Sequence, residues 1–143
     1  HTYLGHPIAC AAALAVQRTV HEQNLLANVV RRGRELRVAL ENAFADHPHV
    51  GDIRGRGLFL GIELVADRGT KAPFAPERKL HLALKHEAME RGLLCYPMGG
   101  AIDGRLGDHV MLAPPLIVDD RHIAEIMEKL PAALDAAIAS SAS

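Results

Sequence analysis

The chain has 143 residues, of which 49% are hydrophobic, 23% are charged and 3% are aromatic, and its formal net charge is −1. This length allows one compact core, and the mixed charges include no basic block that would favour nucleic acid. No apolar run approaches the roughly 20 residues of a membrane-spanning helix, and no basic segment starts a signal peptide, so we expect a cytoplasmic protein without membrane partners.

The first 65 residues predict two helices followed by two strands. Pro7 precedes a run of small apolar residues that ends at Val16, which predicts a helix buried against another layer. Residues 23–44 predict a second helix, because apolar residues recur at steps of three and four. Its expected buried face consists of Leu26, Val30, Gly33, Leu36, Leu40 and Phe44. A short strand is expected at residues 50–53 and a longer, alternating one at 57–65, with a bend at residues 55–57.

The second half predicts a helix, two short strands and a last helix. After a polar loop at 67–76, residues 77–91 predict a helix that Gly92 ends in a left-handed conformation. Strands are expected at 93–96 and 110–112, on either side of a mobile glycine-rich loop at 98–108. The last helix is expected to begin at the N-cap Asp119, to bend at Pro131 and to fray over residues 139–143. Its apolar stripe consists of Ile123, Ile126, Leu130, Leu134 and Ile138.

The resulting order, ααββαββα, predicts an α/β fold of the α+β type, in which helices cover a small, mostly antiparallel sheet. The segment 55–57 lacks the third glycine of a dinucleotide-binding loop and leads into a strand rather than a helix. The histidine spacings do not match those of metal ligands, so no metal site is expected. Cys10 and Cys95 lack a CxxC spacing, which favours buried or neutral thiols in a reducing compartment.

Four stretches in order resemble class III (subgroup II) pyridoxal-phosphate-dependent aminotransferases. Residues 1–15 resemble the family's TYxGHPxACAAALA segment, 53–64 its RGxGLxxGIEL strand pair, 91–94 its RGLL, and 112–118 its xxPPLxI. The resemblance implies the carboxy-terminal portion of a fold-type-I enzyme. Residues 1–20 would end the large cofactor domain, and residues 21–143 would form the small domain. It also implies a homodimer that moves an amino group from an amine or amino acid to an oxo-acid.

The resemblance assigns one cofactor contact to this chain. Thr2 corresponds to the threonine that reaches the phosphate of pyridoxal 5′-phosphate across the family's dimer interface. The Schiff-base lysine and the acidic partner of the pyridine nitrogen lie upstream of Thr2 in the family, so no catalytic residue is expected here. The chain's own lysines are expected at the surface: Lys71, Lys79, Lys85 and Lys129. The chain therefore looks truncated. An alternative remains that it is a non-catalytic fragment acting at most as a structural or dimerisation module.

Several residues are expected near the substrate. Some relatives that bind α-amino or keto acids carry an arginine two residues before the APPL run, where this chain has Met111. A methionine cannot bind a carboxylate, which favours an amine or ω-amino donor. Arg105 is either a substitute for that arginine or an ordinary loop residue. Tyr96 and Met98 either line the substrate mouth or simply pack.

The arginines beside the strand pair have a separate expected role. Arg54 and Arg56 are expected to contact another domain or subunit, and Glu63 to pair with one of them. Aminomutases and a decarboxylating member share this domain, so the resemblance leaves the reaction subtype open.

Overall fold

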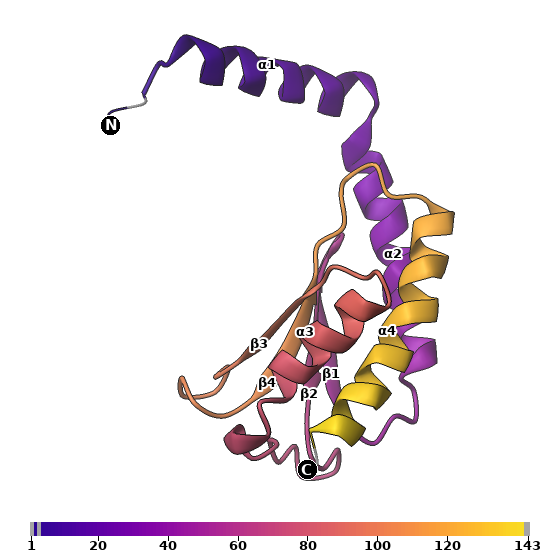
Figure 1. Ribbon diagram of the computed structural model, residues 1–143. Coiled ribbons are helices and arrows are strands. Elements are labelled where there is room, and N and C mark those ends of the chain that lie inside the picture. Colours follow the sequence, from indigo (N-terminus) through magenta and orange to yellow (C-terminus); the bar gives the residue numbers. More distant parts are fainter. Residues whose placement is uncertain (1, 3, 142–143) are drawn as a thin grey trace.

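Helices cover one face of an antiparallel sheet, and the other face of the sheet is open (Figure 1). The computed structural model describes residue 2 and residues 4–141. The helices are α1 (Pro7–Glu22), α2 (Leu25–Ala43), α3 (Leu80–Glu90) and α4 (Asp120–Ser140). The strands are β1 (Val50–Arg56), β2 (Phe59–Leu64), β3 (Tyr96–Gly99) and β4 (Asp108–Leu112). The expected element order and the antiparallel sheet covered by helices are confirmed.

The sheet has the order β1-β2-β4-β3, and all neighbouring strands are antiparallel. The predicted alternation in β2 is confirmed: Leu60, Ile62 and Leu64 are buried, whereas Phe59 is exposed. The first strand is longer than expected and pairs through Arg56 with Phe59. The chain therefore reverses at Gly57 and Leu58, and Gly57 takes a positive φ of 57° there.

One core joins the sheet to α2, α3 and α4. The face expected for α2 is correct from Gly33 to Phe44 but wrong in its first two turns, where Leu26 and Val30 are exposed. Leu25 is buried instead, and Val29 packs against the core. Two adjacent apolar pairs, Leu25-Leu26 and Val29-Val30, fit the helical period equally well, so the period alone could not choose between them.

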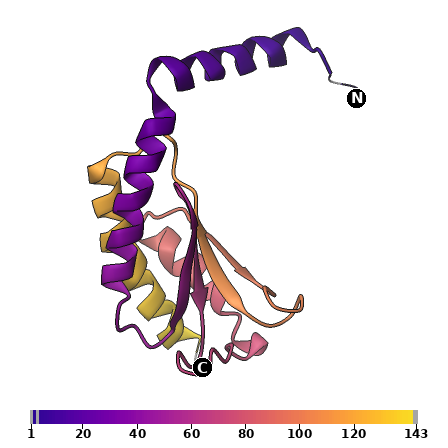
Figure 2. The same cartoon turned by 180° about the vertical axis from the view of Figure 1, so that it is seen from behind.

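The expectation that the first helix is buried is wrong for this chain. α1 has no buried residue, and Ile8, Leu14 and Val16 are all more than half exposed. Figures 1 and 2 show why: α1 leaves the body as an arm from the top of α2, and no other element reaches it. A helix rich in alanine can lie close to a second layer, but the described residues form no such layer beside it.

The end of α3 explains why β3 begins at Tyr96 rather than at residue 93. The Gly92 N–H donates to the carbonyl of Met89 at 2.9 Å, and the Leu93 N–H donates to that of Ala88 at 2.8 Å. These two bonds form a Schellman motif with Gly92 at a φ of 69°, as expected for the left-handed cap. The backbone of Leu93 is thus used by the helix end and is not available to the sheet.

The remaining helix boundaries differ from the expected ones by a few residues. Residues 77–91 are not one helix, because the short 3-10 helix Pro76–Arg78 is separated from α3 by Lys79, which has a φ of 48°. Asp119 caps α4 as predicted, and its carboxylate accepts the His122 N–H at 3.0 Å. That hydrogen bond lowers the pKa of Asp119. α4 continues to Ser140, so the tail does not fray at residue 139. No helix in the described part of the chain is both long and apolar enough to cross a bilayer.

Candidate functional site

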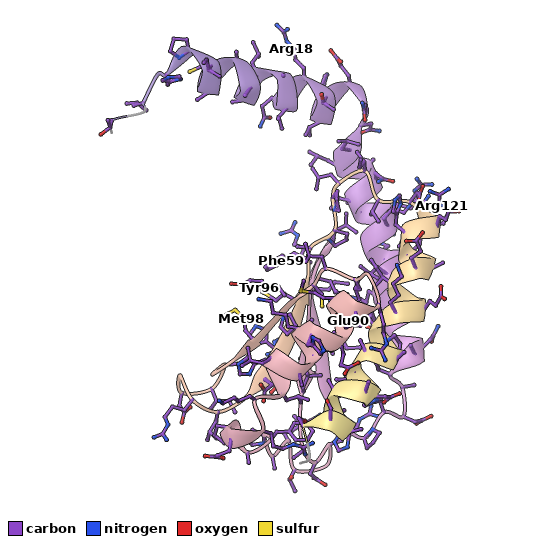
Figure 3. The ribbon with its side chains drawn as sticks, viewed as in Figure 1. Arg18, Phe59, Glu90, Tyr96, Met98 and Arg121 are labelled. Atoms are coloured by element: carbon purple, nitrogen blue, oxygen red, sulfur yellow. The ribbon has the colours of Figure 1, made fainter. Side chains whose placement is uncertain are left out.

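The open face of the sheet carries the residues that were expected at the substrate mouth. Tyr96 on β3 lies directly opposite Met111 on β4, and Met98 lies opposite His109. Met98 and Met111 are diagonal neighbours, offset by two residues along the strands, so the three predicted residues Tyr96, Met98 and Met111 form one patch. Figure 3 shows Phe59, Tyr96 and Met98 following one another along this side, away from the helices. Tyr96 and Phe59 are 58% and 60% exposed, which is unusual for aromatic side chains of a small domain.

Two rows of side chains cross this open face. One row contains Arg54, Gly61, Met111 and Tyr96, which are paired in that order across the four strands. The other row contains Asp52, Glu63, His109 and Met98. The first row is mostly apolar and the second is mostly polar, so the open face is amphipathic.

An ion-pair network fixes the β1 side of the open face. The Arg54 guanidinium donates to Glu63 at 2.6 Å and to Asp52 at 2.9 Å, as expected for the pairing of Glu63 with a neighbouring arginine. The hydrogen bonds to Glu63 and Asp52 raise the pKa of Arg54, and the bond from Arg54 lowers the pKa of Asp52. Arg54 is therefore already neutralised and is not a free anchor for a substrate carboxylate.

A hollow of about 280 Å³ lies between these rows. Its lining includes Gly61, Phe59, Met111, His109 and the Arg54–Glu63 pair. The Nδ1 atom of His109 is buried and has no hydrogen-bond partner among the described residues. The sequence expectations did not include Gly61 or His109. Two features of the sequence could have identified them. Gly61 is a glycine inside a strand, and His109 lies two residues before Met111, on the same face of β4.

Arg105 lies away from this patch in the turn between β3 and β4. The turn is held by its own hydrogen bonds: the Asp103 carboxylate accepts the N–H groups of Arg105 at 2.9 Å and Leu106 at 2.8 Å. These bonds lower the pKa of Asp103, the Leu106 N–H contributing most. The Arg105 side chain is exposed, and among the described residues no hydrogen bond or ion pair joins it to Met111 or Tyr96. Ala101, at the start of the same turn, does line the hollow.

Thr2 lies in an exposed turn before α1, the helix that Figure 1 shows extending from the body. His1 and Tyr3, which belong to the same motif, lie outside the described residues. An exposed hydroxyl has the donor chemistry that suits a phosphate, and α1 begins five residues later, at Pro7, with first-turn N–H groups that lack intrahelical partners. Thr2 precedes α1, which Figure 1 shows extending away from the body, whereas Tyr96, Met98 and Met111 lie on β3 and β4 of the sheet.

The chain's lysines are spread over the surface of the helix-covered body. Lys79 and Lys85 are exposed, and exposed Lys71 donates to the carbonyl of Gly51. Lys129 is half-buried, 3.8 Å from Glu125 on α4. None of these lysines lines the hollow over Gly61. The described residues also hold no group of three or more His, Cys, Asp or Glu side chains that could bind a metal ion.

The two cysteines differ in environment, which gives a direct test of the structure. Cys10 on α1 is exposed, against the expectation of burial, while Cys95 is half-buried and burial raises its pKa to about 11. At pH 8 only about one Cys95 thiol in a thousand is ionised, so alkylation by iodoacetamide should label Cys10 rapidly and Cys95 slowly. Peptide mapping of a time course measures both rates. Equal rates would contradict the half-buried position of Cys95.

The fold of this chain is shared with solved transaminase structures. A thermostable omega transaminase variant from Pseudomonas jessenii superimposes with a TM-score of 0.83 at 35% identity, covering 97% of this chain and 29% of that chain. An uncharacterised aminotransferase of Schizosaccharomyces pombe is 44% identical over 139 residues, which are 97% of this chain and 30% of that protein. Ethanolamine-phosphate phospho-lyase homolog 1 of Caenorhabditis elegans is 37% identical over 131 residues, 91% of this chain and 26% of that protein.

Residues 1–134 match the family model of class-III aminotransferases. The chain therefore belongs to the class-III aminotransferase family. It spans between 26% and 30% of the length of the three relatives named above.

Proposed function

We propose that this chain forms the substrate-facing small domain of a pyridoxal-phosphate-dependent aminotransferase that takes its amino group from an amine or ω-amino donor and passes it to an oxo-acid. The domain boundary falls after residue 20, so that all but the last two residues of α1 belong to the large cofactor domain and residues 21–143 form the small domain. The full-length enzyme is a homodimer. The observation that carries the proposal is the open sheet face, where Tyr96, Met98 and Met111 form a continuous patch of uncharged side chains.

The make-up of the patch supports an amine rather than an α-amino acid as donor. A substrate carboxylate needs a charged, preferably bidentate partner, and neither Tyr96 nor Met111 supplies one. Arg54 is held by two carboxylates, and Arg105 is exposed in a turn that is tied to Asp103. The aromatic ring and the thioethers instead favour contact with an apolar substituent.

The cofactor has one proposed contact in this chain. Pyridoxal phosphate, when bound, supplies the electron sink for amino transfer. Thr2 would donate its hydroxyl hydrogen to the phosphate, and the start of α1 would add N–H donors and the positive end of the helix dipole. The projection of α1 away from the sheet supports a role for Thr2 in the active site of a second subunit. The lysine that forms the Schiff base would lie outside this chain.

A chimera tests the proposal. This chain would replace the matched part of the Pseudomonas jessenii omega transaminase, with that protein's own remaining sequence left intact. We expect the chimera to bind pyridoxal phosphate as a dimer and to transfer the amino group of 1-phenylethylamine to pyruvate. Absorbance of the bound cofactor, light scattering and acetophenone release measure the three properties. A dimeric, cofactor-loaded chimera without any transfer would instead support the alternative of a non-catalytic structural module.

Met111 provides the sharper test of donor class. In the same chimera, Met111→Arg should increase kcat/KM for an α-amino acid donor such as alanine by about tenfold to a hundredfold, because a guanidinium can bind the carboxylate. The kcat/KM for 1-phenylethylamine should fall. Met111→Leu, which preserves size without charge, serves as the matched control and should change neither preference. An unchanged ratio of the two donors in the arginine variant would place Met111 away from the substrate.

A further inference from the structure

The sheet ends on two free edges, one along β1 and one along β3. A strand at the edge of a sheet normally leaves a row of backbone N–H and C=O groups unpaired, and a strand of another chain can pair with that row. β1 has seven residues and β3 has four, so the edge of β1 is the longer of the two. Strand pairing between molecules is therefore expected mainly at β1, unless its outward groups have other partners.

Side chains of the same chain occupy the outward carbonyl groups of β1. The Arg37 guanidinium, on α2, donates to the carbonyl of Ile53 at 3.1 Å and to that of Gly55 at 2.8 Å. The Lys71 ammonium donates to the carbonyl of Gly51. These carbonyls belong to alternate residues, as expected for groups along one edge of a strand. Two basic side chains thus take the positions at which a neighbouring strand would place its N–H groups.

Other charged groups hold this cover in place. Glu41, one helical turn after Arg37, lies 3.4 Å from the guanidinium, so Arg37 is fixed between α2 and the edge of β1. The hydrogen bond from Arg54, and to a smaller extent that from the backbone N–H of Ile53, lowers the pKa of Asp52. One N–H group of β1 is therefore engaged as well. An incoming strand would have to displace Arg37 and leave its charge without these partners, which is costly.

The edge of β3 is unfavourable for pairing for a different reason. Its second residue is Pro97, which has no N–H group to donate. Proline is accommodated in a sheet where its missing N–H would point away from the neighbouring strand. A strand that paired with the free edge of β3 would therefore find no donor at Pro97. Only at β1 would the loss of side chains expose a row of acceptors.

We propose that Arg37 and Lys71 keep the edge of β1 closed, and that this edge is a latent pairing site for β1 of a second copy of the chain. Without the two side chains, the two β1 strands can lie antiparallel and join both sheets into one. The N–H groups of the second strand then replace the basic side chains at the carbonyls of Gly51, Ile53 and Gly55. The proposal is independent of the proposed function, because neither Arg37 nor Lys71 lines the hollow on the open face.

The test compares the self-association of the parent chain with that of a double variant, Arg37→Ala with Lys71→Ala. Sedimentation velocity over a concentration series measures association, and circular dichroism reports the fold. We expect the double variant to keep the parent spectrum and to dimerise with an association constant at least about tenfold above that of the parent. Amide hydrogen exchange at residues 51–55 should slow as the protein concentration rises, because the outward N–H groups become paired. Exchange in α1 should not change.

Two further variants separate the closed edge from a general effect of charge. Arg34→Ala removes the same charge from an exposed position three residues earlier on α2 and should associate like the parent. Arg37→Gln keeps one neutral donor, so it should increase association less than the double variant does, and it replaces the double variant if that chain does not fold. The proposal is overturned if the folded variant associates no more than the parent, if Arg34→Ala associates as strongly, or if the protected amides lie outside β1.

Discussion

Replacing Gly33 with alanine should lower the free energy of unfolding by about 2 kcal/mol, although alanine is the better helix former. Inside a helix, alanine gains roughly 1 kcal/mol over glycine. At Gly33, however, an added Cβ would lie 2.5 Å from the backbone carbon and oxygen of Gly57 in the β1–β2 turn. Both partners are backbone, so α2 and the turn must separate, and overpacking of this kind costs about 1–3 kcal/mol or more. The clash is therefore expected to exceed the gain in helix propensity.

Urea unfolding followed by circular dichroism measures this difference. Gly61→Ala makes the same chemical change where the nearest contact is ordinary, so its stability should lie within about 0.5 kcal/mol of the parent chain or slightly above it. If Gly33→Ala is as stable as the parent chain, α2 does not press against the turn at Gly57.

The strands and the core were predictable where the apolar pattern allows only one choice of buried face. In β2 every second residue enters the core, so Leu60, Ile62 and Leu64 identify the strand and its buried face together. The same holds for Leu80, Leu84 and Ala88 in α3. In α2, two adjacent apolar pairs satisfied the period, and only packing against the sheet selects Leu25 over Leu26.

The failure at α1 has a different cause. Its alanines correctly predict a helix that suits close packing, but a sequence pattern does not say whether the partner layer lies in the same chain. Here α1 extends from the body, and Leu14 and Val16 remain exposed. Burial of α1 would need a second layer beside it, and the described residues do not form one.

The sequence singled out some residues of the candidate site but not their arrangement. Tyr96 and Met111 were each singled out by their neighbours in sequence, yet they are separated by a glycine-rich turn whose length does not fix the register of β3 on β4. The register places them side by side and adds His109. Gly61 was not predicted, because a glycine inside a strand usually just weakens the strand. Only the structure shows that an added Cβ would meet nothing closer than 3.8 Å there.

The first turn of α3 is capped by a residue that comes later in the sequence, on strand β4. Lys79 precedes the helix without any side-chain cap, and instead the carboxylate of Asp108 on β4 accepts the backbone N–H of His81 at 3.2 Å. The same carboxylate oxygen lies 2.8 Å from Nδ1 of the His81 ring. Asp108 is only 6% exposed, so its charge is compensated by these two contacts rather than by water. A strand residue thus caps a helix that begins 28 positions earlier.

Asp108→Ala should therefore lower the free energy of unfolding by about 3 kcal/mol, because it removes two hydrogen bonds to a charged group and leaves a partly buried helix N–H without a partner. Asp108→Asn retains an acceptor oxygen and should recover part of the loss. Asp46→Ala, at an exposed position after α2, controls for loss of one negative charge and should stay within about 0.5 kcal/mol. Hydrogen exchange should show the loss most strongly in the first turn of α3. A uniform loss of protection, or an alanine variant as stable as the asparagine variant, would show that Asp108 does not act as the cap of this helix.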